Sequence, residues 1–128
     1  MRPLLLLGAG LMCAYACGGD ELSPRGILAR NELRAIAERV RAFNRDHEHV
    51  ADIARTPEAV PCGPVAWNDP SGTLQRIGYA PDHVVPFSFE LVNGNTLRAY
   101  ADRDCDRDYA IYELHLDPPA LTTTNDPE

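Results

Sequence analysis

Four aspartates alternate with other residues in one short stretch of the chain, and a glutamate follows them. The set comprises Asp102, Asp104, Asp106, Asp108 and Glu113, the last being the twelfth residue counted from the first. Carboxylate oxygens at this spacing suit Ca²⁺, which prefers hard oxygen ligands in a loop. The glycine that such a loop needs at its sixth position is Arg107 here. Two interpretations stay open: a calcium site, or a solvated turn whose charge Arg103 and Arg107 balance without metal.

A cysteine that follows small residues ends the apolar start of the chain. A positive charge at the second position precedes apolar residues up to Ala16, and Cys17 comes next. This pattern is typical of a secretory signal, and the run is short for a membrane-spanning helix. The junction resembles a bacterial lipoprotein signal, in which the cysteine becomes the lipid-bearing first residue. We therefore expect a signal peptide over 1–16, palmitate-type acylation of Cys17 and a tether over 17–23. An ordinary cleaved signal is the alternative.

Two cysteines remain beyond this anchor, Cys62 and Cys105. An exported protein reaches an oxidising compartment, where an even pair of cysteines predicts a disulfide bond. The bond would close a ring worth about 3–4 kcal/mol in the chain-entropy model. Two free thiols are the alternative, and a redox-active pair is disfavoured because the chain has no Cys-x-x-Cys motif.

An amphipathic helix is predicted after the tether. Ser23 and Pro24 are a good N-cap and a good first helical residue. Apolar residues then recur at helical spacing and form one stripe. The stripe consists of Ala29, Leu33, Ile36, Val40 and Phe43. We expect the helix to end between residues 44 and 54.

Three antiparallel strands are predicted in the second half of the chain. Apolar and polar residues alternate over Val85–Leu91, Thr96–Asp102 and Tyr109–Asp117, which indicates strands with one buried face. Asn93 and Gly94 tolerate positive φ and form the strongest short hairpin signal. A sheet with one apolar face needs a cover, which the helix can supply.

The sequence therefore predicts one α+β domain over residues 24–117. Its amphipathic helix packs on a three- to four-stranded antiparallel meander sheet. Residues 55–83, rich in proline and glycine, form a long connection pinned to the core by Trp67, Leu74 and Ile77, with a short strand or turn at 74–77. Residues 118–128 are predicted to be a disordered tail.

Charge and motifs narrow the classes of function. The formal net charge is −7, which disfavours nucleic acid as a partner. The sequence contains no phosphate loop and no Gly-x-Ser-x-Gly motif, so we expect no enzymatic activity. Glu90 and Glu113 are predicted on the exposed face of the sheet, where carboxylate pairs are common without catalysis. Apart from calcium, no cofactor is indicated.

The order of elements resembles a known family between Ile27 and Leu116. A helix and a proline-rich connection precede the pattern Gly-Tyr-x-Pro-Asp-x-x-Val-x-Phe-Ser-Phe, a hairpin and an Asp-x-Asp-x-Asp loop. This resembles the globular heads of type IV pilin-like proteins of myxobacteria, although their long apolar assembly helix is missing. The resemblance implies a non-enzymatic binding or structural module with an envelope or pilus-type protein partner.

Signal and resemblance together predict the location of the protein. We expect it to be exported and held by its lipid in the bacterial cell envelope, facing the periplasm at the outer membrane. The alternative function is a calcium-dependent adhesion or ligand-binding domain of a pilus or secretion accessory.

Overall fold

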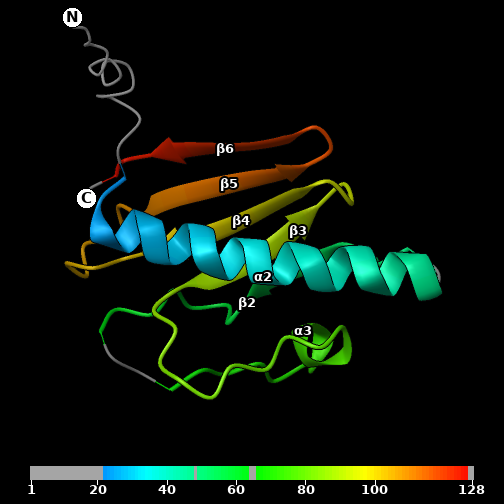
Figure 1. The fold of residues 1–128 in the computed structure, drawn as a ribbon. Coiled ribbons are helices and arrows are strands. Elements are labelled where there is room, and N and C mark those ends of the chain that lie inside the picture. The colour runs from blue at the N-terminus through cyan, green and yellow to red at the C-terminus, as the bar shows by residue number, and fades with distance from the viewer. Residues whose placement is uncertain (1–21, 48, 64–65, 127–128) are drawn as a thin grey trace, which may run out of the picture.

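One long helix lies along one face of a five-stranded antiparallel sheet (Figure 1). The computed structural model describes residues 22–47, 49–63 and 66–126. In chain order the elements are α2 (Pro24–Asp46), β2 (Ile53–Thr56), α3 (Thr73–Arg76), β3 (Ser88–Val92), β4 (Thr96–Ala101), β5 (Ala110–Leu116) and β6 (Pro119–Thr124). The strands are neighbours in the order of the sequence, so the sheet is a meander. The predicted α+β class is confirmed, with one or two more strands than expected.

Helix α2 begins and ends where local chemistry favours it. The Ser23 hydroxyl accepts a hydrogen bond from the Gly26 amide at 3.0 Å, and Pro24 occupies the first turn. At the other end, the His47 amide donates to the Phe43 carbonyl at 2.8 Å. The predicted apolar stripe is the buried face of this helix. The helix therefore supplies the cover that the sheet needs.

The hairpin between β3 and β4 fixes the register of the central strands. Asn93 and Gly94 both have positive φ, and the Asn95 amide donates to the Val92 carbonyl at 3.2 Å. This is the turn that the Asn-Gly pair predicts. Both turn amides also donate to the carboxylate of Asp52, at 2.9 and 2.8 Å. The side chain of Asp52, which precedes β2, thus holds a turn 41–42 residues away along the chain.

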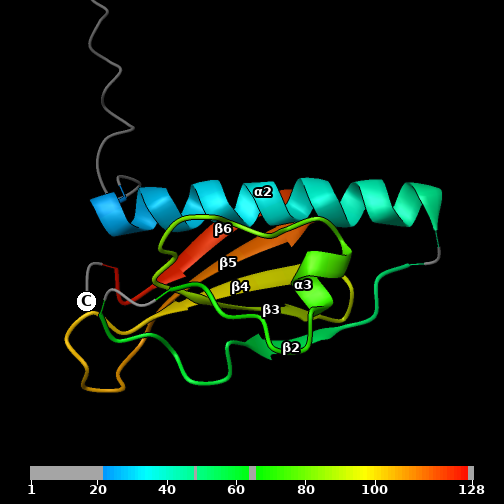
Figure 2. The same cartoon turned by 90° about the horizontal axis from the view of Figure 1, so that it is seen from below.

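The core lies between α2 and one face of the sheet. Buried and partly exposed residues alternate strictly along β4 and β5, as predicted. The Phe89 ring centroid lies 5.7–6.0 Å from those of Trp67, Tyr79 and Phe87, and the Trp67 and Tyr79 centroids lie 5.6 Å apart. Figure 2 shows that α3 and the connection around it lie on the same side of the sheet as α2. The connection therefore extends the cover over β2 and β3.

The structure corrects three local predictions. Residues 119–124 form the edge strand β6, paired with β5 from Leu116 to Ile111, where a disordered tail was predicted. Leu121 is the only residue of β6 that is partly buried, so the strand shows no alternation of apolar residues. Strand β2 was also missed, and residues 73–76 form a short helix instead of a strand or turn.

Within the described ranges, no helix is long and apolar enough to cross a membrane. The predicted signal peptide, the acylation site Cys17 and most of the tether lie outside the residues that the structure describes.

Candidate functional site

The acidic loop, residues 102–108, joins β4 to β5 and folds around one buried carboxylate. Asp102 is 5% exposed, and its two oxygens accept hydrogen bonds from the amides of Asp106 and Arg107 at 3.1–3.3 Å. Cys105 and Arg107 adopt positive φ. The carboxylate thus fixes a tight turn by accepting hydrogen bonds from two of its amides.

Three of the five predicted calcium ligands come together. Each of Asp102, Asp104 and Asp106 offers an oxygen within 4.8 Å of the other two. Asp108 is not part of this group, although its amide donates to Asp106 at 2.9 Å. Glu113 points elsewhere, because it pairs with Arg98 on the sheet. The structure therefore gathers part of the predicted ligand set, and one of the three carboxylates already serves the turn.

The two exposed carboxylates of the group influence each other. A hydrogen bond in which Asp104 donates to the neighbouring Asp106 raises the pKa of Asp104 above its ordinary value. The pKa of Asp106 is lowered, first by the Asp108 amide and then by Asp104. Carboxylates this close repel when both are ionised, so one holds its proton more firmly than the other.

A disulfide bond fastens the acidic loop to the connection. Cys62 and Cys105 are bonded, with their Cα atoms 5.2 Å apart, as the sequence predicted. The bond encloses a ring with a sequence separation of 43 residues. It holds the loop against the segment that follows β2.

A cluster of arginine and tyrosine lies on the face of the sheet that α2 does not cover. This outer-face cluster consists of Arg55, Arg98, Tyr100 and Tyr109. The Arg55 guanidinium lies 5.3 Å from the Tyr100 ring centroid and 5.7 Å from that of Tyr109. The two rings meet edge to face at 6.1 Å. All four side chains are partly exposed, so they contact one another and remain accessible at the surface.

Arg98 joins two glutamates across three strands of this outer face. Its Nε donates to Glu113 at 2.6 Å and its Nη1 to Glu90 at 3.0 Å. The Tyr100 hydroxyl also donates to Glu90. The hydrogen bond with Glu90, followed by that with Glu113, raises the pKa of Arg98. The two glutamates are thus engaged by a permanent cation rather than aligned as a catalytic acid and base.

His83 and Tyr79 share a carboxylate on the opposite side of the sheet. Glu32 of α2 accepts a hydrogen bond from the Tyr79 hydroxyl at 2.6 Å and lies 3.1 Å from Nε2 of His83. Burial, then the hydrogen bond to Glu32, raises the pKa of Tyr79, and Glu32 also raises the pKa of His83. These contacts tie the connection to α2.

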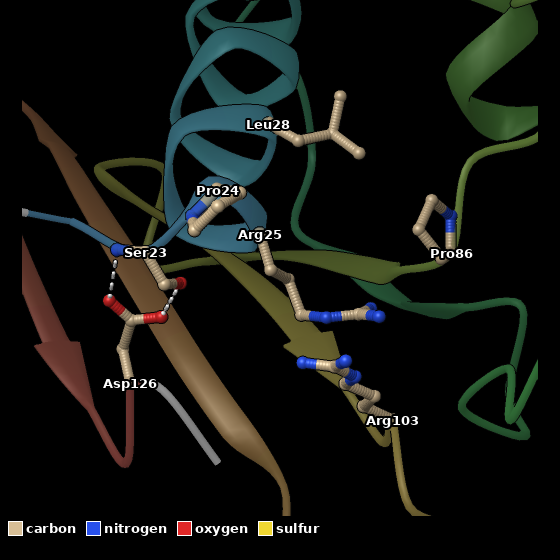
Figure 3. Close-up of a pocket in the computed structure, with 7 residues that line it drawn as sticks. All are labelled: Ser23, Pro24, Arg25, Leu28, Pro86, Arg103 and Asp126. Atoms are coloured by element: carbon tan, nitrogen blue, oxygen red, sulfur yellow. Dashed lines mark hydrogen bonds between the residues drawn. The ribbon is translucent and has the colours of Figure 1, made fainter.

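A hollow at the N-terminal end of α2 was not predicted from the sequence. This arginine pocket has a volume of about 400 Å³ and is lined by Ser23, Pro24, Arg25, Leu28, Pro86, Arg103 and Asp126. Figure 3 shows the side chains of Arg25, from α2, and of Arg103, from the acidic loop, both extending into this hollow. The two residues are 78 positions apart in the sequence, so no local pattern could have brought them together.

The far wall of the pocket joins the two ends of the domain. Asp126 accepts hydrogen bonds from the amide and the hydroxyl of Ser23, drawn in Figure 3, and from the Tyr112 hydroxyl at 2.6 Å. Burial acts to raise the pKa of Asp126, but the hydrogen bonds from Ser23 and Tyr112 outweigh it and lower the pKa. The ionised carboxylate is therefore held in place by its neighbours.

Comparison with known protein families, characterised proteins and solved structures finds no match to this chain. The resemblance to pilin-like heads thus stays a prediction, and the function has to be argued from the geometry.

Proposed function

We propose that the chain is a lipid-anchored, pilin-like binding or structural module of the bacterial cell envelope, without enzymatic activity. Cys17 carries the acyl chains, and the domain binds an envelope or pilus-type protein. The proposed location is the periplasmic side of the outer membrane.

The observation that carries this proposal is the outer-face cluster. Protein interfaces are enriched in tyrosine and arginine, which supply large contact areas and directional hydrogen bonds. Here Arg55 and Arg98 stand beside Tyr100 and Tyr109 on a strand surface that neither α2 nor α3 covers. Their mutual contacts hold the side chains in place before a partner arrives, which reduces the entropy lost on binding.

Acylation is tested by labelling the bacterial protein with an alkyne analogue of palmitate. We expect label on the wild-type chain, none on Cys17→Ser and full label on Cys13→Ser, the matched control four residues upstream. Membrane fractionation should follow the same order. Label that persists in Cys17→Ser would contradict the anchor.

Partner binding is tested by affinity capture from envelope membranes. The Arg55→Ala and Tyr100→Ala variants remove both halves of the cation–π contact, whereas Arg76→Ala changes an exposed arginine on α3. We expect a defined envelope protein to be captured by the wild type and by Arg76→Ala, and to be lost with the other two. Equal capture by all four would remove the outer-face cluster from the proposal.

A second candidate is a calcium-dependent adhesion or ligand-binding domain. The grouping of Asp102, Asp104 and Asp106 favours it. A cation that binds only the folded chain raises its stability in proportion to the logarithm of the cation concentration. Thermal unfolding with millimolar Ca²⁺ against chelator tests this candidate, and a midpoint that does not move rules it out.

A further inference from the structure

We propose that the free edge of β6 is an interface for a second copy of this chain. The partner's own β6 pairs with it in the antiparallel sense and extends the sheet across a twofold axis. This interface shares no residue with the outer-face cluster and does not require acylation of Cys17, so it goes beyond the proposed function.

Two residues of β6 direct their backbone amides and carbonyls away from the sheet. The Leu116 amide donates to the Asn95 carbonyl at 2.8 Å, on the β4 side of β5, and Leu116 is paired with Pro119 of β6. Pro119 therefore directs its own backbone groups away from β5, and the direction alternates from one residue to the next. It follows that the groups of Leu121 and Thr123 lie on the outer edge of β6, which no described strand occupies (Figure 1).

This edge lacks the features by which proteins protect a free strand. Charged side chains, bulges, internal prolines and short length usually prevent further pairing. Strand β6 has six residues and no charged one, its proline is the first residue, and its register with β5 is regular throughout. The opposite edge strand, β2, has four residues and an irregular register with β3. The sheet is therefore open to a further strand at the β6 edge.

The outward groups of β6 are complementary to themselves about a twofold axis at Thr122. Antiparallel pairing about this axis places Leu121 opposite the partner's Thr123, and Thr123 opposite the partner's Leu121. Each pair exchanges amide and carbonyl hydrogen bonds, because both of its members direct these groups outward. Thr122 faces the partner's Thr122, and threonine pairs are favourable across strands. One register thus satisfies the outward groups of both copies.

The groove beside β6 favours a second copy over a charged peptide. It has a volume of about 830 Å³, lies between α2 and the hairpin of β5 and β6, and is lined in part by Leu121. Its charged lining residues are two of each sign, Arg34 and Arg41 against Glu38 and Asp117. An acidic strand would meet the two carboxylates, and a basic strand the two guanidinium groups. A second copy brings the same balanced set, so charges of both signs are present on each side of the axis.

The proposed pairing also fixes how the two domains face. Side chains of paired antiparallel strands keep the same faces on the same side of the sheet. Both α2 helices therefore lie on one side of the extended sheet, and both outer-face clusters lie on the other. A partner with two sites would engage both clusters at once, which raises its apparent affinity.

Sedimentation velocity of the full-length chain in a density-matched nonionic detergent measures the association. Thr123→Pro removes one outward amide and leaves the hydrogen bonds to β5 in place, since proline is compatible with an edge strand at such a position. Thr123→Ala keeps the amide and is the matched control. We expect the wild type and Thr123→Ala to form dimers. Dimer affinity should fall at least about tenfold in Thr123→Pro, because the lost hydrogen bond occurs on both sides of the axis.

Cysteine cross-linking tests the register and decides the matter should Thr123→Pro fail to fold. In the proposed pairing, the Cα atoms of Thr122 and the partner's Thr122 lie about 4.5 Å apart, which suits a disulfide bond. Those of Thr124 and the partner's Thr124 lie about 13 Å apart along the strands, which is too far. Both residues are exposed on the same strand. We expect oxidation to link Thr122→Cys into a dimer and to leave Thr124→Cys unlinked.

Four results would overturn the interface. These are a wild-type chain that sediments as a monomer at every concentration, equal association of folded Thr123→Pro and Thr123→Ala, and equal cross-linking of the two cysteine variants. The fourth is a cross-linked product of Thr122→Cys whose mass is not twice that of the chain, because a different protein would then occupy the edge.

Discussion

Asp126 shows how one side chain can join parts of a fold that are distant in sequence. Its carboxylate accepts hydrogen bonds from Ser23 at the start of α2 and from Tyr112 in β5. Burial, then the hydrogen bond to Asp126, raises the pKa of Tyr112, so this hydroxyl keeps its proton as a donor. The residue belongs to the segment predicted to be disordered, and nothing near it in the sequence indicates its partners.

The first prediction concerns the stability of this junction. Asp126→Ala removes a charged acceptor from a buried hydroxyl and from the helix cap, so we expect a loss of about 1–3 kcal/mol in the free energy of unfolding. Urea unfolding at neutral pH measures it. Asp126→Asn, which keeps the size and one oxygen, should lose less. Equal stability of Asp126→Ala and the wild type would contradict the role.

A pH dependence follows from the same carboxylate. Its pKa in the folded chain is lowered, so folding favours the ionised form. The stabilisation is therefore complete above the ordinary aspartate pKa of about 3.9 and is lost as the pH falls through the lowered folded value. We expect the free energy of unfolding to fall on acidification in the wild type and to fall less in Asp126→Asn. Parallel pH profiles for the two chains would refute this assignment.

The next prediction concerns Arg98, which separates two glutamates on the outer face of the sheet. Without it, Glu90 and Glu113 would face each other across β4 with no cation between them. Arg98→Ala should cost about 1–2 kcal/mol, since two partly exposed charge-assisted hydrogen bonds are lost. Adding Glu90→Gln to this variant should recover part of the loss by removing one negative charge. A double variant less stable than Arg98→Ala would show that repulsion is not the cause.

At the scale of elements, the sequence predicted those helices, strands and turns whose structure depends on the pattern of neighbouring residues. Strands β4 and β5 alternate strictly between buried and partly exposed residues, α2 carries a regular apolar stripe, and the turn at Asn93 has the residues that its backbone requires. Edge strand β2 has only four residues and edge strand β6 has no buried side chain, so main-chain pairing with a neighbouring strand defines them. That pairing depends on the positions of β3 and β5 in the folded chain. A short stretch of sequence does not show these positions.

The prediction at the scale of elements concerns the stability that the disulfide bond contributes. Replacing Cys62 and Cys105 together with serine opens a ring with a sequence separation of 43. The unfolded chain gains freedom, and we expect a loss of about 3–4 kcal/mol in the free energy of unfolding. Urea unfolding with and without reductant measures it: reductant should lower the wild type to the level of the variant and leave the variant unchanged. A variant as stable as the oxidised wild type would contradict the expectation.

At the scale of the whole molecule, one end of the domain gathers the features that sequence patterns did not connect. The start of α2, the acidic loop and the end of β6 lie together there (Figures 1 and 2). The acidic loop was predicted because its aspartates are close in sequence. The arginine pocket was not, because Arg25 and Arg103 meet only after α2 has packed on the sheet. A pocket formed by residues that are distant in sequence can be recognised only once the fold is known.

The last prediction concerns the packing of α2 on the sheet. Leu33 is fully buried in the middle of the α2 stripe, against a sheet whose core face includes Leu97 and Tyr112. Leu33→Ala leaves a cavity between the two layers, and we expect a loss of about 2–5 kcal/mol. The exposed neighbour Arg34→Ala changes the same helix without touching the core and should stay within about 0.5 kcal/mol of the wild type. Urea unfolding of the two variants measures the difference. Equal losses would mean that helix propensity, rather than contact with the sheet, holds α2 in place.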